Sequence, residues 1–134
     1  MAMKEKEKFS IRKRIRSFRY AFDGLCLLFR EEHNARIHAL AALVVVVLGF
    51  LFDIKAVEWI ALVVCIALVV SAEIVNSALE RVADFIKVER DDRKRDIKDL
   101  GAAAVLVCAI GAAVVGLIVF VPYIWMWGVS CMGR

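Results

Sequence analysis

The chain has 134 residues, of which 62% are hydrophobic, and a formal net charge of +4. This composition is too apolar for a soluble domain, and the chain is too short for two ordinary domains. It predicts one membrane protein, whose basic segments favour anionic headgroups or nucleotide phosphates over nucleic acid as partners.

The N-terminal segment combines a charged start with a helical pattern. From Ile15, large apolar residues recur every three or four positions, and arginines occupy the other faces. This pattern is typical of an amphipathic helix lying in the membrane surface. The polar stretch that follows contains no Pro or Gly, and a continuous helix here would bring Glu32, Arg36 and His38 to the membrane surface. Neither His33 nor His38 shows partner spacing, which favours interfacial solvation.

Three apolar segments follow, Ile37–Phe52, Ala56–Ala72 and Leu100–Trp127. Each approaches or exceeds the roughly 17 to 25 residues that cross a bilayer core, so we expect three transmembrane helices. Basic residues concentrate in residues 4–36 and 81–98, which places the N-terminus and the second connection in the cytoplasm and the C-terminus outside. The predicted fold is an all-α membrane protein forming one domain, 1–134, with a tail and surface helix in 1–36 and three transmembrane helices in 37–127.

The second apolar segment ends in a polar helix face. At about 100° per residue, five polar side chains fall within roughly a quarter of the circumference. They are Glu73, Asn76, Ser77, Glu80 and Asp84. A carboxylate at the edge of the hydrocarbon costs about 2.5 to 3.5 kcal/mol unless it has a partner or a function, so three acids on one face predict a site.

The depth of these acids indicates their chemistry. Glu73 lies deepest, where a carboxylate can act as a general base on a lipid hydroxyl. Glu80 and Glu32 lie nearer the surface and offer oxygen ligands of the kind that Mg²⁺ binds together with substrate phosphates. Together with a cation for the transferred phosphate, these acids suit phosphorylation of a membrane alcohol.

The third helix adds features suited to a phosphate. The mixed-charge run 89–96 predicts a solvated cytoplasmic loop. A helix starting at Ile97 would offer free backbone N–H groups, and Lys98 would neutralise charge on a transferred phosphoryl group. Small residues between Gly101 and Gly116 favour close approach of another helix, and hence an oligomer.

Two alternatives stay open from the residues alone. The same acids could serve a cation or proton carrier, or a structural membrane subunit whose acids bind lipid headgroups. The middle of the second and third spans contains no formal charge, which argues against transport. Neither a Walker-type P-loop nor a kinase-like glycine-rich loop occurs, so the common nucleotide folds are not predicted.

Two sequence runs resemble the signature of the small prokaryotic diacylglycerol kinase family, which includes undecaprenol kinases. They are Glu73-Ile74-Val75-Asn76-Ser77-Ala78-Leu79-Glu80 with Asp84, and Lys98-Asp99-Leu100-Gly101-Ala102-Ala103-Ala104-Val105. The resemblance extends from about Arg16 through the third span. It implies a homotrimer in the prokaryotic cytoplasmic membrane, with active sites shared between subunits, that transfers the γ-phosphoryl group of ATP to a lipid hydroxyl.

The resemblance also implies roles for particular residues. Glu73 would be the general base, Asn76 would orient the reacting groups, and Glu32 and Glu80 would bind the Mg²⁺ that carries ATP. The expected ATP-binding residues are Lys98, Asp99, Asp84, Tyr20, Arg16 and Lys13, and the expected lipid-substrate residues are Glu73, Ser77 and Ala102. The run from Glu32 to His38 resembles the undecaprenol kinase branch more closely, which favours undecaprenol over diacylglycerol. Ala21 and Ala35 depart from the residues that the family commonly has there.

Overall fold

The computed structural model describes residues 10–85 and 92–132, which form four helices and no strand. The helices are α1 (Ile11–Glu31), α2 (His33–Leu51), α3 (Ala56–Phe85) and α4 (Asp92–Met132). This confirms the predicted all-α class. Helices α2, α3 and α4 are each long and apolar enough to cross a membrane, as the three apolar segments predict.

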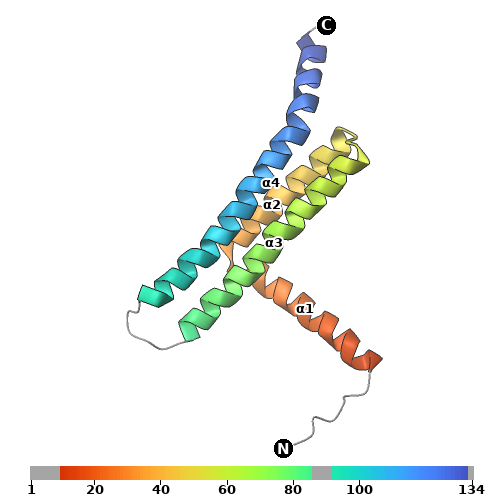
Figure 1. The fold of residues 1–134 in the computed structure, drawn as a ribbon. Helices are drawn as coiled ribbons and strands as arrows, with labels where there is room; N and C mark the ends of the chain where they lie inside the picture. Colours follow the sequence, from red (N-terminus) through yellow and green to blue (C-terminus); the bar gives the residue numbers. More distant parts are fainter. Residues whose placement is uncertain (1–9, 86–91, 133–134) are drawn as a thin grey trace, which may run out of the picture.

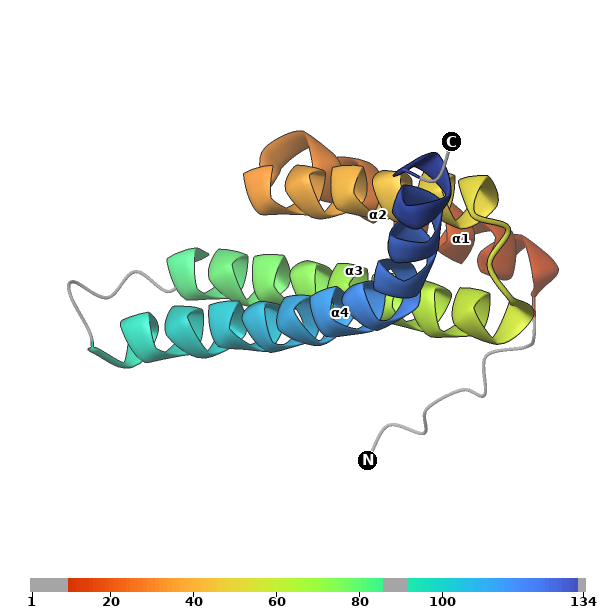
Figure 2. The same ribbon diagram turned by 90° about the horizontal axis from the view of Figure 1, so that it is seen from above.

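The three long helices run side by side, and α1 projects away from the end of the bundle where α2 begins (Figure 1). The most extensive contact joins α3 to α4, which the view from above shows lying along each other (Figure 2). Helix α4 continues past the turn between α2 and α3 and bends there. Pro122 lies inside this helix, and a proline removes a backbone donor and kinks a helix.

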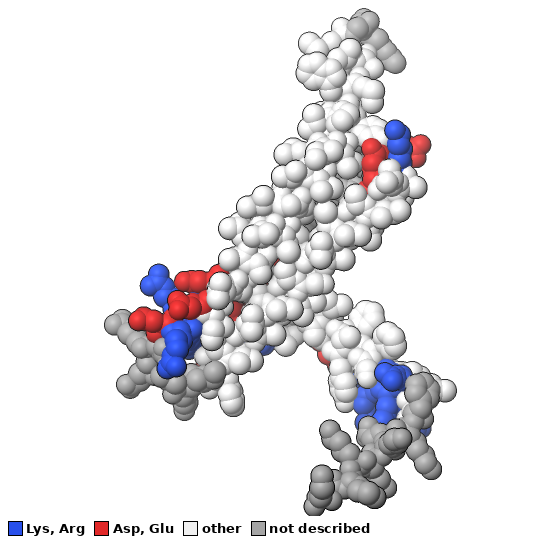
Figure 3. All heavy atoms as spheres, in the orientation of Figure 1, with Lys and Arg blue, Asp and Glu red and all other residues white. Residues whose placement is uncertain are grey.

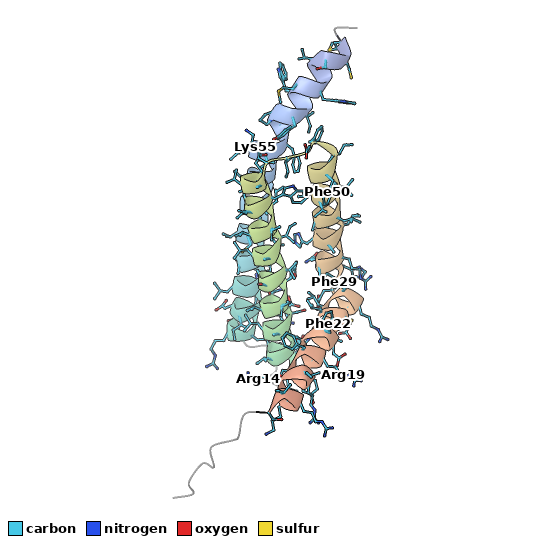
Figure 4. All side chains as sticks on the ribbon, turned by 90° about the vertical axis from the view of Figure 1, so that its right-hand side faces the viewer. Arg14, Arg19, Phe22, Phe29, Phe50 and Lys55 are labelled. Carbon is cyan, nitrogen blue, oxygen red and sulfur yellow. The ribbon has the colours of Figure 1, made fainter. Side chains whose placement is uncertain are left out.

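Helix α1 carries both the basic and the aromatic residues of the predicted surface helix. Arg14, Arg19, Phe22 and Phe29 are distributed along it (Figure 4). Phe22 is 67% exposed, because few other parts of the chain cover this helix. That α1 lies in the membrane surface stays a prediction, since exposure of apolar side chains in a single chain does not by itself identify what covers them.

The turn between α2 and α3 is closed by backbone hydrogen bonds. Ile54 N donates to Gly49 O at 3.2 Å and Asp53 N donates to Phe50 O at 3.4 Å, the pair of bonds of a Schellman motif. Asp53 adopts a φ of 48°, a left-handed conformation that Asp tolerates better than most residues. At Gly49 a side chain would not fit, because a Cβ would stand 2.7 Å from the Trp59 ring.

A small core forms at the same end of the bundle. Its buried residues come from the turn, α3 and α4, and are Ile54, Leu62, Val119 and Phe120. Above it, Glu58 Oε2 accepts hydrogen bonds from Lys55 N at 2.7 Å and from Tyr123 Oη at 2.8 Å. This core and its polar cover fix α4 against the turn, so the register of α3 and α4 at the other end is set as well.

Two expectations about local structure are wrong. Helix α4 begins at Asp92, so the described part of the mixed-charge run is helical rather than a loop, and Ile97 is not a helix start. Arg and Lys are good helix formers, and Asp92 in the first turn suits the helix dipole. Lys98 therefore lies in the second turn, without free helix N-terminal N–H groups beside it. The sequence also predicts that the second membrane helix carries its acidic face as far as about Val88, and that predicted end lies outside the described residues.

The polar stretch before the first span is also not one continuous helix. Glu32 has φ −97° and ψ 116°, an extended conformation that ends α1 and precedes α2. The guanidinium of Arg36 donates from Nε to Phe29 O at 2.8 Å and from Nη2 to Arg30 O. These bonds satisfy carbonyl groups at the C-terminus of α1, which stabilises the break and sets the direction in which α1 leaves the bundle.

Candidate functional site

Glu73 lies on α3 with its side chain buried. It is 3% exposed, and its Oε1 lies 3.2 Å from His38 Nε2 across the interface of α2 and α3. The orientation of the two side chains is not that of a hydrogen bond, so Oε1 has no hydrogen-bond partner among the described residues. A buried carboxylate beside an imidazole is an arrangement suited to exchanging a proton. The expectation that His38 is merely solvated at the interface is wrong.

Glu32 reaches the same face of α3 from the break between α1 and α2. Its Oε1 accepts a hydrogen bond from Ser77 Oγ at 2.7 Å. The neighbouring Glu31 forms a second link, with its Oε2 2.9 Å from Arg81 Nη2. The residues of each pair are more than 40 positions apart in the chain, so both contacts are tertiary. They hold the extended segment at Glu32 against α3.

Asn76 and Glu80 are joined along α3. Asn76 Nδ2 donates to Glu80 Oε1 at 3.1 Å, while Asn76 Oδ1 is buried without a hydrogen-bond partner among the described residues. This amide packs directly on the backbone of α4, since a Cβ at Gly101 would collide with Asn76 Oδ1. The glycine is therefore required for close approach of the two helices. Ala102, the next residue, is exposed.

Asp84, at the end of α3, and Lys98, near the start of α4, form an ion pair. Lys98 Nζ lies 2.8 Å from Asp84 Oδ1, and Lys94 Nζ lies 3.1 Å from the same oxygen. Asp99 is exposed and pairs with Arg95 at 3.5 Å. Two predicted ATP-binding residues thus contact each other, so a phosphate at Lys98 would compete with Asp84.

The predicted nucleotide residues of α1 are not gathered with the others in a single chain. Lys13, Arg16 and Tyr20 lie on a helix that projects away from the bundle (Figure 1), and Tyr20 is 64% exposed. The charged side chains form separate groups on α1, at the joined ends of α3 and α4, and at the turn between α2 and α3 (Figure 3). Between these groups the face in this view shows only a few charged atoms (Figure 3).

The oxygen ligands of the site fit a magnesium ion that also binds phosphate. Glu32 and Glu80 each engage one carboxylate oxygen with a neutral side chain of α3, and each keeps a second oxygen. Carboxylate oxygens are hard ligands, and Mg²⁺ commonly binds through one or two of them plus substrate phosphates. In residues 10–85 and 92–132 no group of three or more His, Cys, Asp or Glu side chains is placed to hold a metal.

The sequence did not predict that His38 contacts Glu73, or that Asn76 packs closely against Gly101. The available signal for His38 was an imidazole at the predicted depth of Glu73. For Gly101 it was a helix rich in small residues, but that pattern does not identify which side chain approaches the glycine.

Comparison with known proteins identifies the family. The model of the family described as prokaryotic diacylglycerol kinase matches residues 19–120. The chain is 34% identical over 107 residues to the undecaprenol kinase of Bacillus subtilis, covering 80% of this chain and 87% of that protein. It is 34% identical over 100 residues to the diacylglycerol kinase of Escherichia coli strain K12, covering 75% and 82%. It is 32% identical over 108 residues to the diacylglycerol kinase of Haemophilus influenzae, covering 79% and 92%.

The family match extends from Arg19 in α1 over α2 and α3 and most of α4, and it confirms the resemblance stated from the sequence. The chain therefore belongs to the prokaryotic diacylglycerol kinase family, a family of membrane lipid kinases.

Proposed function

We propose that this protein transfers the γ-phosphoryl group of ATP to the hydroxyl group of a membrane lipid alcohol. The observation that carries the proposal is the buried Glu73, which begins a line of polar side chains leading along α3 to Glu80 and out of the apolar region. A hydroxyl at the membrane end and a phosphate at the polar end would meet on this face. Family membership supports the same reaction class.

Residues of this chain can carry out each part of the proposed reaction. Glu73 accepts the proton of the lipid hydroxyl, whose oxygen forms a bond to the γ-phosphorus while the bond to the β-phosphate oxygen breaks and ADP leaves. Asn76, held by Glu80, orients the reacting groups. Lys98 offers positive charge near the phosphates. Glu32 and Glu80 would hold Mg²⁺, which neutralises phosphate charge when bound. Detection of a stable phosphorylated protein intermediate would contradict this direct transfer.

The proposed working unit is a homotrimer with shared sites. Most apolar side chains of the spans are exposed in the single chain, as expected if lipid and neighbouring subunits cover them. The nucleotide residues Lys13, Arg16 and Tyr20 lie on α1, which points away from its own bundle and could meet a neighbour. The proposed location is the prokaryotic cytoplasmic membrane, with the N-terminus in the cytoplasm and the C-terminus outside.

Undecaprenol is the slightly favoured lipid. Overall identity does not separate the two candidates, because it is 34% to both the Bacillus undecaprenol kinase and the Escherichia coli diacylglycerol kinase. The preference rests on the run from Glu32 to His38, which resembles the undecaprenol kinase branch.

The proposal is tested by ATP-dependent phosphate transfer in mixed micelles, with undecaprenol and diacylglycerol offered separately. Glu73→Gln keeps the shape of the side chain but removes the base, and we expect turnover to fall by about 10²- to 10⁴-fold. Glu58→Gln is the matched control, since Glu58 is a carboxylate at the opposite end of the same helix, and it should keep wild-type turnover. A folded protein that phosphorylates neither lipid would rule out the kinase proposal and favour a carrier or structural subunit.

A further inference from the structure

His38 is a polar residue in the second turn of a membrane-spanning helix, and its side chain faces the proposed base. Its Nε2 lies 3.2 Å from Glu73 Oε1, and the two side chains are 26% and 4% exposed. The distance is within the usual range of an N–H···O hydrogen bond, so only a change in ring orientation separates the present arrangement from one.

The other hydrogen-bond donors near the site are occupied elsewhere. Ser77 donates to Glu32, and Asn76 donates to Glu80. The nearby cations are also paired, Arg81 with Glu31 and Lys98 with Asp84. Within the described residues His38 is therefore the side chain that contacts the Glu73 carboxylate from another helix.

The surroundings of His38 make its orientation matter. The same imidazole borders a cavity of about 510 Å³ between α2, α3 and α4, whose remaining lining is apolar and includes Val45, Val69 and Phe120. Electrostatic interactions are stronger beside such a medium than in water. Oε1 of Glu73, next to this imidazole, has no hydrogen-bond partner among the described residues, and a general base must be held within hydrogen-bond reach of the proton that it removes.

We propose that His38 is a positioning residue for the phosphoryl transfer. When the ring turns so that Nε2–H donates to Oε1 of Glu73, His38 holds that oxygen and leaves Oε2 for the lipid hydroxyl. This inference rests on the proposed function, in which Glu73 is the base. It differs from a packing role for the imidazole, because positioning depends on a donor at the Nε2 location rather than on side-chain volume.

Two amide variants test the donor without introducing an apolar group. In His38→Gln the amide nitrogen can occupy the Nε2 location, whereas in His38→Asn it ends one bond short of it. We expect His38→Gln to keep kcat within about threefold of wild type and His38→Asn to lose about 10- to 100-fold, the effect of a roughly 1 Å misplacement. The KM for ATP should not change in either. His33→Asn, at the exposed histidine one turn earlier, is the matched control and should behave as wild type.

The decisive measurement is a double-mutant cycle with Glu73→Gln. It compares kcat values that are each corrected for the fraction of folded protein, which is measured by circular dichroism and thermal unfolding. A residue that acts only through the base should cause no further loss when the base is already removed. Equal losses from His38→Asn in both backgrounds, or equal losses from His38→Asn and His38→Gln, would overturn the inference. Wild-type protein without lipid kinase activity would instead refute the proposed function itself.

Discussion

Gly101→Ala separates the stability of the helix pair from the geometry of the site. The added Cβ would collide with Asn76 Oδ1 and lie 3.7 Å from Leu79 Cδ1. Replacing Gly by Ala inside a helix is favourable by about 0.5–1 kcal/mol, while overpacking a close contact costs about 1–3 kcal/mol. The free energy of unfolding should therefore fall by somewhere between about zero and about 2.5 kcal/mol.

The effect on activity should be larger than the effect on folding suggests. To make room, the Asn76 amide must rotate away from α4, which breaks its 3.1 Å hydrogen bond to Glu80. A hydrogen bond to a charged group is worth about 1.5–3 kcal/mol. If this orientation is needed in the transition state, that loss corresponds to a turnover reduced about 10- to 150-fold.

The assay is lipid phosphorylation in mixed micelles, with unfolding followed in parallel. Gly128→Ala is the matched control, because it lies on the same helix outside the run of small residues, and a Cβ there meets nothing within 4 Å of it in the same chain. It should raise stability by about 0.5–1 kcal/mol and leave turnover unchanged. Wild-type turnover in Gly101→Ala would refute the reasoning that the glycine serves the orientation of Asn76.

Two further predictions concern opposite ends of the bundle. Lys98→Gln should raise the KM for ATP at least about tenfold, because it removes the positive charge offered to the phosphates, and an unchanged KM would exclude Lys98 from the ATP site. Tyr123→Phe removes the 2.8 Å hydrogen bond to Glu58 and should lower the free energy of unfolding, measured by denaturation in detergent. Its turnover should stay at the wild-type level, and a large loss would show that the outer end is coupled to the site.

The number of membrane helices and their centres were predictable from hydropathy. The three predicted apolar segments fall almost entirely within α2, α3 and α4, because the thickness of a bilayer sets a minimum apolar length. The polar face of α3 was predictable for a related reason. Helical periodicity is local, so residues three and four positions apart share a face whatever else the chain does.

Contacts between helices were not predictable in the same way. The pairing of His38 with Glu73 depends on how far α2 slides along α3, and that register is set by the Schellman turn and the small core at the other end. The helical start at Asp92 was missed because a mixed-charge run suits both a solvated loop and a helix stabilised by its charges. The break at Glu32 has no Pro or Gly to mark it, and the carbonyl groups that Arg36 satisfies become apparent only in three dimensions.

The break at Glu32 also constrains how the protein matures as it leaves the ribosome. Glu32 is synthesised 45 residues before Ser77, its hydrogen-bond partner, and Glu31 is 50 residues ahead of Arg81. The first span can insert, and Arg36 can bond to the end of α1, before these partners exist, but the contacts of Glu31 and Glu32 with α3 form only after α3 has been synthesised. A chain halted after its first span therefore lacks the acidic site, so assembly of the site reports that insertion has progressed.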